Sequence, residues 1–211
     1  MKEKCMEISD MAGIVLAGGF SSRMGRDKAK LTFQGKTFLE IQIEKMKNIG
    51  ITEIIVSGYE DCPDDVICVR DVIAHKGPMS GIHAGLKAMS KPCALVVAID
   101  IPLIPEQVLE QLIHAHEPGL ISVTVVDGKP EPLIGIYDKS LADACEEVLQ
   151  SEKPAVYRLL NKMGYRGIEY NGDLRAIMNC NTVKEYDVLT SCGHIYEYVN
   201  VNGGSEIGKD F

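Results

Sequence analysis

The chain has 211 residues, of which 30 are acidic and 22 basic, so its formal net charge is −8 at pH 7 with neutral histidine. Hydrophobic residues make up 45% and charged residues 25%, which excludes a disordered, collagen-like or low-complexity chain. The acidic balance argues against a protein that coats nucleic acid or an anionic membrane, so we expect neither as a partner. At this length a single domain with a sizeable core is expected.

The seven cysteines favour a reducing compartment, because their number is odd and no pair has the C-x-x-C spacing of a zinc or redox site. The apolar run at 11–17 does not fit a secretory signal, because acidic residues precede it and two glycines and basic residues follow it. No stretch approaches the ~18 apolar residues of a membrane helix. We therefore expect reduced thiols in a soluble, cytoplasmic protein.

The hydrophobic pattern alternates between strands and helices down to about residue 118. Apolar runs predict strands at 11–17, 54–56, 66–69 and 93–99, and helical spacing predicts helices at 37–48, 80–89 and 105–116. This alternation is typical of a parallel sheet that is covered by helices on both faces.

The pattern changes after residue 118. Segments 120–126 and 133–137 flank the turn signal Asp127-Gly-Lys-Pro130, which predicts a hairpin that adds one antiparallel strand to the sheet. Further helices are expected at 140–150 and 154–162. The alternating segment 195–201 predicts one more strand, which would extend this sheet or pair with a neighbouring molecule.

The fold class expected from these patterns is α/β, a single-domain, Rossmann-like, mostly parallel mixed sheet with one antiparallel strand. The domain would span residues 1–190, and residues 191–211 would form a C-terminal tail that carries the extra strand. We expect a monomer or a weak homo-oligomer.

A glycine-rich loop follows the first strand at residues 16–28. Gly18 and Gly19 lack Cβ atoms, so backbone N–H groups there can approach phosphate oxygens closely. Arg23 and Lys28 would add positive charge toward a triphosphate. The loop matches neither G-x-x-x-x-G-K-[ST] nor G-x-G-x-x-G, which argues against a P-loop protein and against a dinucleotide-dependent oxidoreductase. The alternative is an ordinary turn with solvated basic residues, but the combination of glycines, hydroxyls and cations favours a phosphate site.

Asp100 follows the most apolar strand of the chain and would lie at the carboxyl edge of the sheet, where open α/β sheets bind ligands. Mg²⁺ is often held by one or two carboxylates, with phosphate oxygens and water completing its coordination. The alternative is that Asp100 caps the turn before Pro102 and Pro105. Beside a phosphate loop, we favour the metal ligand.

The segment Gly77-Pro-Met-Ser-Gly81 is a third candidate, with Asp71 preceding it at the end of a strand. Its glycines would let an anion approach a helix N-terminus, although a plain loop with Ser80 as the N-cap is the simpler interpretation. His114 and His116 are two residues apart and therefore on different helix faces, so they do not predict a metal pair.

Together these segments resemble a known family. The opening segment Leu16-Ala-Gly-Gly-Phe-Ser-Ser-Arg-Met-Gly-Arg-Asp-Lys28 resembles the signature of the MobA-type molybdenum cofactor guanylyltransferases. The later matches follow in the family's order: Val56-Ser-Gly58, Gly77-Pro-Met-Ser-Gly81, Ala98-Ile-Asp-Ile-Pro102, Glu131-Pro-Leu-Ile-Gly-Ile-Tyr137 and Asn179-Cys-Asn-Thr182. The resemblance covers roughly residues 12–189, and the ordered set is more specific than any one motif.

The resemblance implies a nucleotide-diphospho-sugar transferase fold and an Mg²⁺-dependent nucleotidyl transfer. GMP would pass from GTP to the terminal phosphate of Mo-molybdopterin, with release of pyrophosphate. GTP and Mo-molybdopterin would then be the ligands, and proteins of molybdoenzyme maturation are candidate partners.

The resemblance also implies roles for particular residues. The catalytic set would be Arg23, Lys28 and Asp100, with Asp100 as the Mg²⁺ ligand and Asp71 against the guanosine. The ligand-binding residues would be Leu16, Ala17, Gly18, Gly19, Ser21, Ser22, Lys28, Ser57, Asp71, Gly77, Asp100, Asn179 and Asn181. Either asparagine would complete the metal or pterin side.

Two other interpretations stay open. One is a cytidylyltransferase of the same fold that acts on molybdopterin or on a sugar or polyol phosphate. The Ala17-Gly-Gly19 start favours the guanylyl reaction, because cytidylyl relatives more often carry Ala-Ala-Gly there. The other is a non-catalytic, nucleotide-binding regulatory protein. The presence of Arg23, Lys28 and Asp100 favours an enzyme, because a sensor does not require a metal carboxylate.

Overall fold

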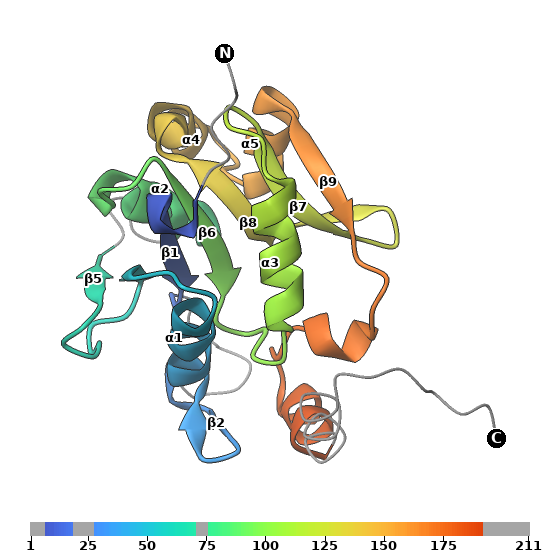
Figure 1. The fold of residues 1–211 in the computed structure, drawn as a ribbon. Helices are drawn as coiled ribbons and strands as arrows, with labels where there is room; N and C mark the ends of the chain where they lie inside the picture. Colours follow the sequence, from blue (N-terminus) through green and yellow to red (C-terminus); the bar gives the residue numbers. More distant parts are fainter. Residues whose placement is uncertain (1–6, 19–27, 71–75, 192–211) are drawn as a thin grey trace.

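The computed structural model describes residues 7–18, 28–70 and 76–191. Its main sheet has seven strands in the order β5-β4-β1-β6-β8-β7-β9 (Figure 1). The strands are β1 (Met11–Leu16), β4 (Glu53–Ser57), β5 (Ile67–Val69), β6 (Cys93–Ala98), β7 (Ile121–Val126), β8 (Lys129–Asp138) and β9 (Tyr165–Glu169). Strand β8 runs antiparallel to both its neighbours, and the other neighbouring pairs are parallel. The expected mixed sheet with one antiparallel strand is confirmed.

Helices cover both faces of the sheet. Figure 1 shows α1 (Phe38–Asn48) and α3 (Glu106–Ala115) in front of it, and their apolar residues share one core cluster. Helices α2 (Pro78–Ala88), α4 (Ala142–Leu149) and α5 (Val156–Met163) form a second cluster on the other face. Strands β1 and β6 are buried at every position. Their continuous apolar runs are the consequence of burial on both faces.

Local sequence signals account for the start of α1 and for the turn between β7 and β8. Helix α1 starts with a capping box, in which the Thr37 side chain accepts from the Glu40 N–H and the Glu40 carboxylate accepts from the Thr37 N–H. The β7–β8 hairpin turns at Asp127 and Gly128, whose φ angles of 49° and 71° require residues that tolerate the left-handed region. Lys129 and Pro130, expected in the turn, already belong to β8.

Three strands and one helix were not expected from the sequence. Strands β2 (Thr32–Phe33) and β3 (Lys36–Thr37) form a short separate hairpin, and β9 pairs in parallel with β7 at the sheet edge. Strand β9 is mostly exposed, so it lacks the apolar alternation by which strands are recognised. Residues 183–191 form a helix beside α1.

The expectation of reduced thiols is wrong for one pair of cysteines. Cys62, in the loop that joins β4 to β5, forms a disulfide with Cys68 of β5, with their Cα atoms 6.1 Å apart. The pairing depends on how this loop folds back, which their spacing alone does not reveal. Among the described cysteines, Cys93, Cys145 and Cys180 are buried and carry no disulfide.

Within the described ranges, no helix is long and apolar enough to cross a bilayer. The expected strand at 195–201 lies outside the described residues, and the division of the chain at residue 190 stays a prediction.

Candidate active site

The carboxyl ends of three parallel strands meet where the strand order reverses about β1. Leu16, the last residue of β1, lies in register with Ser57 of β4 on one side and Ala98 of β6 on the other. The N–H groups of Ala17 and Gly18 both donate to the Ser57 carbonyl, at 2.9 and 3.0 Å. The Ile99 N–H donates to the Leu16 carbonyl. This edge is the position at which open α/β sheets bind ligands.

Two glycines let the loops after β1 and β4 pack backbone to backbone. A Cβ on Gly58 would lie 2.3 Å from the Gly18 Cα, and the φ of Gly58 is +80°, so no other residue fits there without displacement. A Cβ on Gly18 would lie 3.1 Å from the Gly58 Cα. The neighbouring loop therefore leaves little room for a side chain at Gly18, whether or not a phosphate approaches it. In the sequence, Gly58 was noted as part of Val56-Ser-Gly58 but was given no role of its own.

Lys28, Asp100 and Asn181 come together from three distant parts of the chain. The Lys28 Nζ lies 2.9 Å from Asp100 Oδ2 and also donates to Asn181 Oδ1. The Lys28 and Asp100 side chains are only 14% and 17% exposed. The Cys180 N–H donates to the Asp100 carbonyl at 2.7 Å, which fixes the asparagine segment against the end of β6. Sequence analysis singled out all three side chains, and the structure brings them together.

Glu185 holds Asn181 in place. The Asn181 N–H donates to Glu185 Oε2 at 2.7 Å, and the Glu185 N–H donates to the Thr182 hydroxyl at the start of helix 183–191. The hydrogen bond from Asn181 is the main reason that the pKa of Glu185 is lowered, and the Lys28 charge lowers it further. Glu185 was missed from the sequence, although Thr-x-x-Glu is a helix-start signal.

The two oxygens of Asp100 differ in their surroundings. Oδ2 accepts from Lys28, whereas Oδ1 is buried and has no hydrogen-bond partner among the described residues. A buried polar atom without a partner is rare, because it loses its hydration without compensation. A carboxylate oxygen is the kind of ligand that Mg²⁺ prefers, and one protein carboxylate can be enough when phosphates supply the rest. The residues present therefore fit a divalent cation on Asp100.

The family model for the MobA-like NTP transferase domain matches residues 13–166. The chain belongs to this family. It is thus a nucleotidyltransferase enzyme, and the resemblance inferred from the motifs is confirmed.

Individual relatives align with this MobA-like chain over most of its length. A probable molybdenum cofactor guanylyltransferase from Peptoclostridium acidaminophilum is 32% identical over 225 aligned positions, which cover 96% of this chain and 99% of that protein. One from Bacillus cytotoxicus is 28% identical and covers 88% of this chain and 98% of that protein. The crystal structure of molybdopterin-guanine dinucleotide biosynthesis protein A from Archaeoglobus fulgidus has the same fold, with a TM-score of 0.72 at 24% identity. That match covers 89% of this chain and all of the other.

The structure also describes Ser57, Gly77 and Asn179 among the other expected site residues of this MobA-like domain. Ser57 is 1% exposed, and its hydroxyl lies under the first turn of α2, where a Cβ on Gly81 would approach it to 3.1 Å. Gly77 is the N-cap of α2, with a φ of 68°. Asn179 is half-buried, two residues before Asn181. The remaining expected residues, Gly19, Ser21, Ser22, Arg23 and Asp71, lie outside the described ranges.

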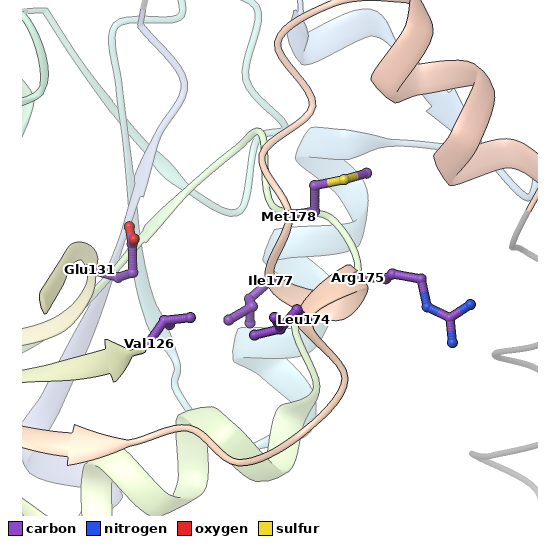
Figure 2. A pocket seen from close by; sticks show the side chains of 6 residues that line it. All are labelled: Val126, Glu131, Leu174, Arg175, Ile177 and Met178. Carbon is purple, nitrogen blue, oxygen red and sulfur yellow. The ribbon is translucent and has the colours of Figure 1, made fainter. Parts of the chain in front are cut away.

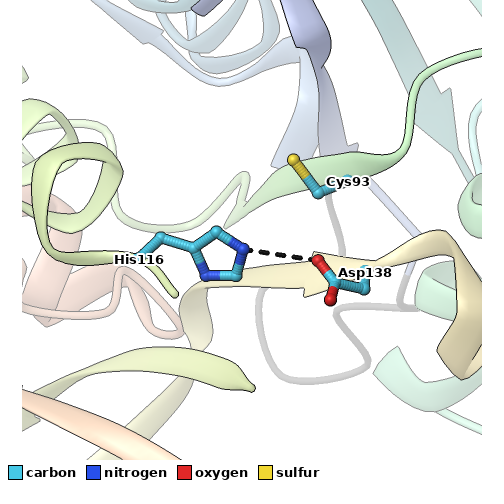
Figure 3. A group of neighbouring side chains, drawn as sticks. All are labelled: Cys93, His116 and Asp138. Atoms are coloured by element: carbon cyan, nitrogen blue, oxygen red, sulfur yellow. Dashed lines mark hydrogen bonds and ion pairs between the residues drawn. The ribbon is translucent and has the colours of Figure 1, made fainter. Parts of the chain in front are cut away.

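A second cluster of metal-ligand residue types lies at the amino edge of the same sheet (Figure 3). Ligand-type atoms of Cys93, His116 and Asp138 lie within 4.8 Å of one another. The His116 Nε2 is 3.3 Å from Asp138 Oδ1, its Nδ1 is 3.0 Å from the Ser122 hydroxyl, and Asp138 Oδ2 accepts from the Gly119 N–H.

Each ring nitrogen of His116 and each carboxylate oxygen of Asp138 thus has a protein partner. Burial raises the pKa of the Cys93 thiol to about 12, so it keeps its proton at neutral pH. These groups form a hydrogen-bonded network that ties the connection between α3 and β7 to the end of β8. A metal ion is not needed to account for them.

Proposed function

We propose that this protein transfers GMP from GTP to the terminal phosphate of Mo-molybdopterin in an Mg²⁺-dependent reaction that releases pyrophosphate. One observation carries the proposal. Lys28, Asp100 and Asn181 converge at the carboxyl edge of the sheet, where Asp100 has a buried oxygen without a partner among the described residues. The choice of GTP and of molybdopterin is supported by relatives named as probable molybdenum cofactor guanylyltransferases.

The reaction needs positioning and charge neutralisation rather than an enzyme nucleophile. An oxygen of the acceptor phosphate attacks the α-phosphorus of GTP, the bond to the β-phosphate oxygen breaks, and pyrophosphate leaves. The acceptor phosphate is already ionised at pH 7, so no general base is required. Asp100 Oδ1 would hold Mg²⁺, which when bound supplies positive charge to the triphosphate.

In this proposal, Lys28 would neutralise negative charge on the phosphates of the nucleotide. Its ammonium donates to Asp100 and Asn181 at the protein end of the site, and its flexible stem lets a further donor turn toward phosphate oxygens. Glu185 accepts a hydrogen bond from the Asn181 backbone, so Asn181, which accepts from Lys28, is already held in place before substrate arrives. Arg23 would add a second cation from the first loop.

The replacement Asp100→Asn tests the proposal, because it keeps the size of the side chain and removes its charge. With Mg²⁺ and Mo-molybdopterin, we expect pyrophosphate release from GTP to fall by about 100-fold or more, with the fold intact by circular dichroism. The control is Asp143→Asn on α4, whose side chain is 91% exposed, and its rate should equal that of the wild type.

GTP, CTP, ATP and UTP are offered separately. Release with GTP alone supports the proposal, and release with CTP alone overturns the base assignment. Undiminished turnover in Asp100→Asn contradicts the role of that carboxylate. GTP binding without pyrophosphate release would identify a regulatory protein instead.

A further inference from the structure

The carboxyl edge of the sheet has a cavity of about 290 Å³, which the reaction site described above does not use. It is lined by Val126, Glu131, Leu174, Arg175, Ile177 and Met178 (Figure 2). Figure 2 shows Val126 and Glu131 of the β7–β8 hairpin on one side, and Leu174 and Ile177 on the other. The last two belong to a short 3-10 helix, η4 (Leu174–Ile177). The Arg175 guanidinium points away from the hairpin and pairs with Asp173.

The cavity adjoins the reacting groups. Met178, which lines it, precedes Cys180 by two residues, and the Cys180 N–H donates to the Asp100 carbonyl. Two residues of extended chain span at most about 7 Å, so a molecule in the cavity can place a phosphate on a short arm beside Asp100. A group that occupies the cavity would therefore belong to a substrate of the same reaction.

The lining combines apolar walls with one carboxylate. Val126, Leu174, Ile177 and Met178 provide the apolar surfaces that a flat aromatic ring requires. Glu131 is half-buried, and no described residue donates a hydrogen bond to its carboxylate. Burial raises its pKa, as expected for a carboxylate without a compensating donor. Its cross-strand partner Thr124 also has a buried hydroxyl with no partner among the described residues.

We propose that this cavity receives the pterin ring of the acceptor and that the Glu131 carboxylate binds its 2-amino and N3–H groups. The inference rests on the proposed function, because that function supplies the pterin. The pyrimidine edge of a pterin presents two adjacent N–H donors, and a carboxylate presents two acceptors with matching separation. Glu131 is thus a specificity-determining residue, which selects a ring with a 2-amino group over one with a carbonyl at that position.

Guanine carries the same pair of donors, so the base of GTP is the other possible source of this edge. The position of the cavity favours the acceptor. The cavity lies beyond β6, on the side of β7 and β8. Ser57, which was expected to bind the nucleotide, ends β4 on the opposite side of β1. The two sources are separated by measuring the Michaelis constant of each substrate.

The test compares two fluorescent probes, 6-hydroxymethylpterin and 6-hydroxymethyl-lumazine, which differ in the 2-amino group. We expect the wild type to bind the pterin about tenfold more tightly than the lumazine, and Glu131→Gln to lose this preference. In turnover, the variant should raise KM for Mo-molybdopterin about tenfold and leave KM for GTP unchanged. Glu169→Gln, at an exposed position of β9, is the matched control and should behave as the wild type.

Equal binding of the two probes by the wild type, or an unchanged preference in Glu131→Gln, would overturn the inference. A rise in KM for GTP alone would assign the cavity to guanine and overturn it as well. Binding is measured without turnover, so the two proposals fail separately. Pterin selection through Glu131 in a chain that releases no pyrophosphate supports the cavity assignment and contradicts the proposed reaction.

Discussion

At the scale of one residue, the two oxygens of Asp100 carry the proposal that a cation binds at this edge of the sheet. Its Oδ2 is paired with Lys28, and its Oδ1 is buried and has no partner within the described part of the chain. Burying such an atom opposes folding, and proteins keep these arrangements mainly where a ligand will use them. The orphaned oxygen therefore explains more about function than the ion pair beside it.

Lys28 and Asp100 were singled out in the sequence because each lies in a short motif with its own chemistry, whereas Asn181 was implied only by the resemblance to the family. Glu131 and Glu185 could not be found in the same way. Glu185 acts on the backbone of Asn181, and Glu131 matters only because a cavity forms around it. Roles of this kind depend on which residues become neighbours in space.

Two tyrosine hydroxyls donate to carbonyls of the same strand, β8, and together they test what burial adds to a hydrogen bond. The Tyr137 hydroxyl donates to the Pro132 carbonyl, and the Tyr157 hydroxyl donates to the Pro130 carbonyl, both at 2.7 Å. Tyr137 is fully buried, whereas Tyr157 is 49% exposed.

We expect Tyr137→Phe to lower the free energy of unfolding by about 1–2 kcal/mol, because the Pro132 carbonyl loses its donor where water cannot replace it. Tyr157→Phe should change it by less than about 0.5 kcal/mol. Urea denaturation measures both values. Equal effects of the two variants would show that the buried carbonyl finds another donor.

At the scale of elements, helix α1 supports the segment that carries Asp100. The buried Gln42 amide donates to the carbonyls of Ala98 and Ile101, at 3.1 and 2.8 Å. The Lys45 ammonium donates to the carbonyls of Pro102 and Ile104, both at 2.6 Å. These two side chains satisfy the carbonyl of Ala98 at the end of β6 and three carbonyls in the turn after it. The contacts join residues more than fifty positions apart, so helical periodicity predicted the element but not its role.

Lys45 should make stability depend on pH in alkaline solution. Burial lowers the pKa of its ammonium from 10.5 to about 8, with Glu106 opposing the shift. Between these two values the unfolded chain binds the proton more than the folded one, so this group makes the protein more stable as the pH rises. Below pH 8 both states are protonated, and the full desolvation penalty is present.

We therefore compare the wild type with Lys45→Met, which lacks the titrating group. The stability of the wild type relative to the variant should rise by about 2 kcal/mol between pH 7 and pH 10. Chemical denaturation at several pH values measures the difference, in which the titration of other groups cancels. A pH-independent difference would show that Lys45 keeps an ordinary pKa.

At the scale of the whole molecule, the sheet separates two polar sites. The proposed reaction site lies at the carboxyl edge, beyond Ala98 at the end of β6. The network of His116 and Asp138 lies at the amino edge, where Asp138 is in register with Cys93 at the start of β6. Six residues of strand separate the two edges by about 20 Å.

The central strands β1 and β6 are buried at every position, and such strands are the elements that apolar runs predict. The edge elements β2, β3 and β9 depend on pairing partners that composition does not reveal, as does the disulfide between Cys62 and Cys68. The amino-edge network was also not foreseen. His114 and His116 were not expected to form a metal pair on a helix, and that expectation did not point to the partners of His116, which come from β7 and β8.

The separation of the edges predicts that Asp138→Asn weakens the fold without changing the reaction. The amide would present N–H groups toward either the His116 ring or the Gly119 N–H, both of which now face carboxylate oxygens. We expect the free energy of unfolding to fall by about 1–3 kcal/mol, while kcat per folded molecule and both KM values stay at the wild-type level.

Ser122→Ala, which removes the partner of the other ring nitrogen, is the milder variant if Asp138→Asn does not fold. Asp100→Asn should show the reverse behaviour, with turnover lost and the fold retained. A fall in kcat for Asp138→Asn at full folding would mean that the two edges are coupled through β6, and that the amino-edge network also positions the reaction site.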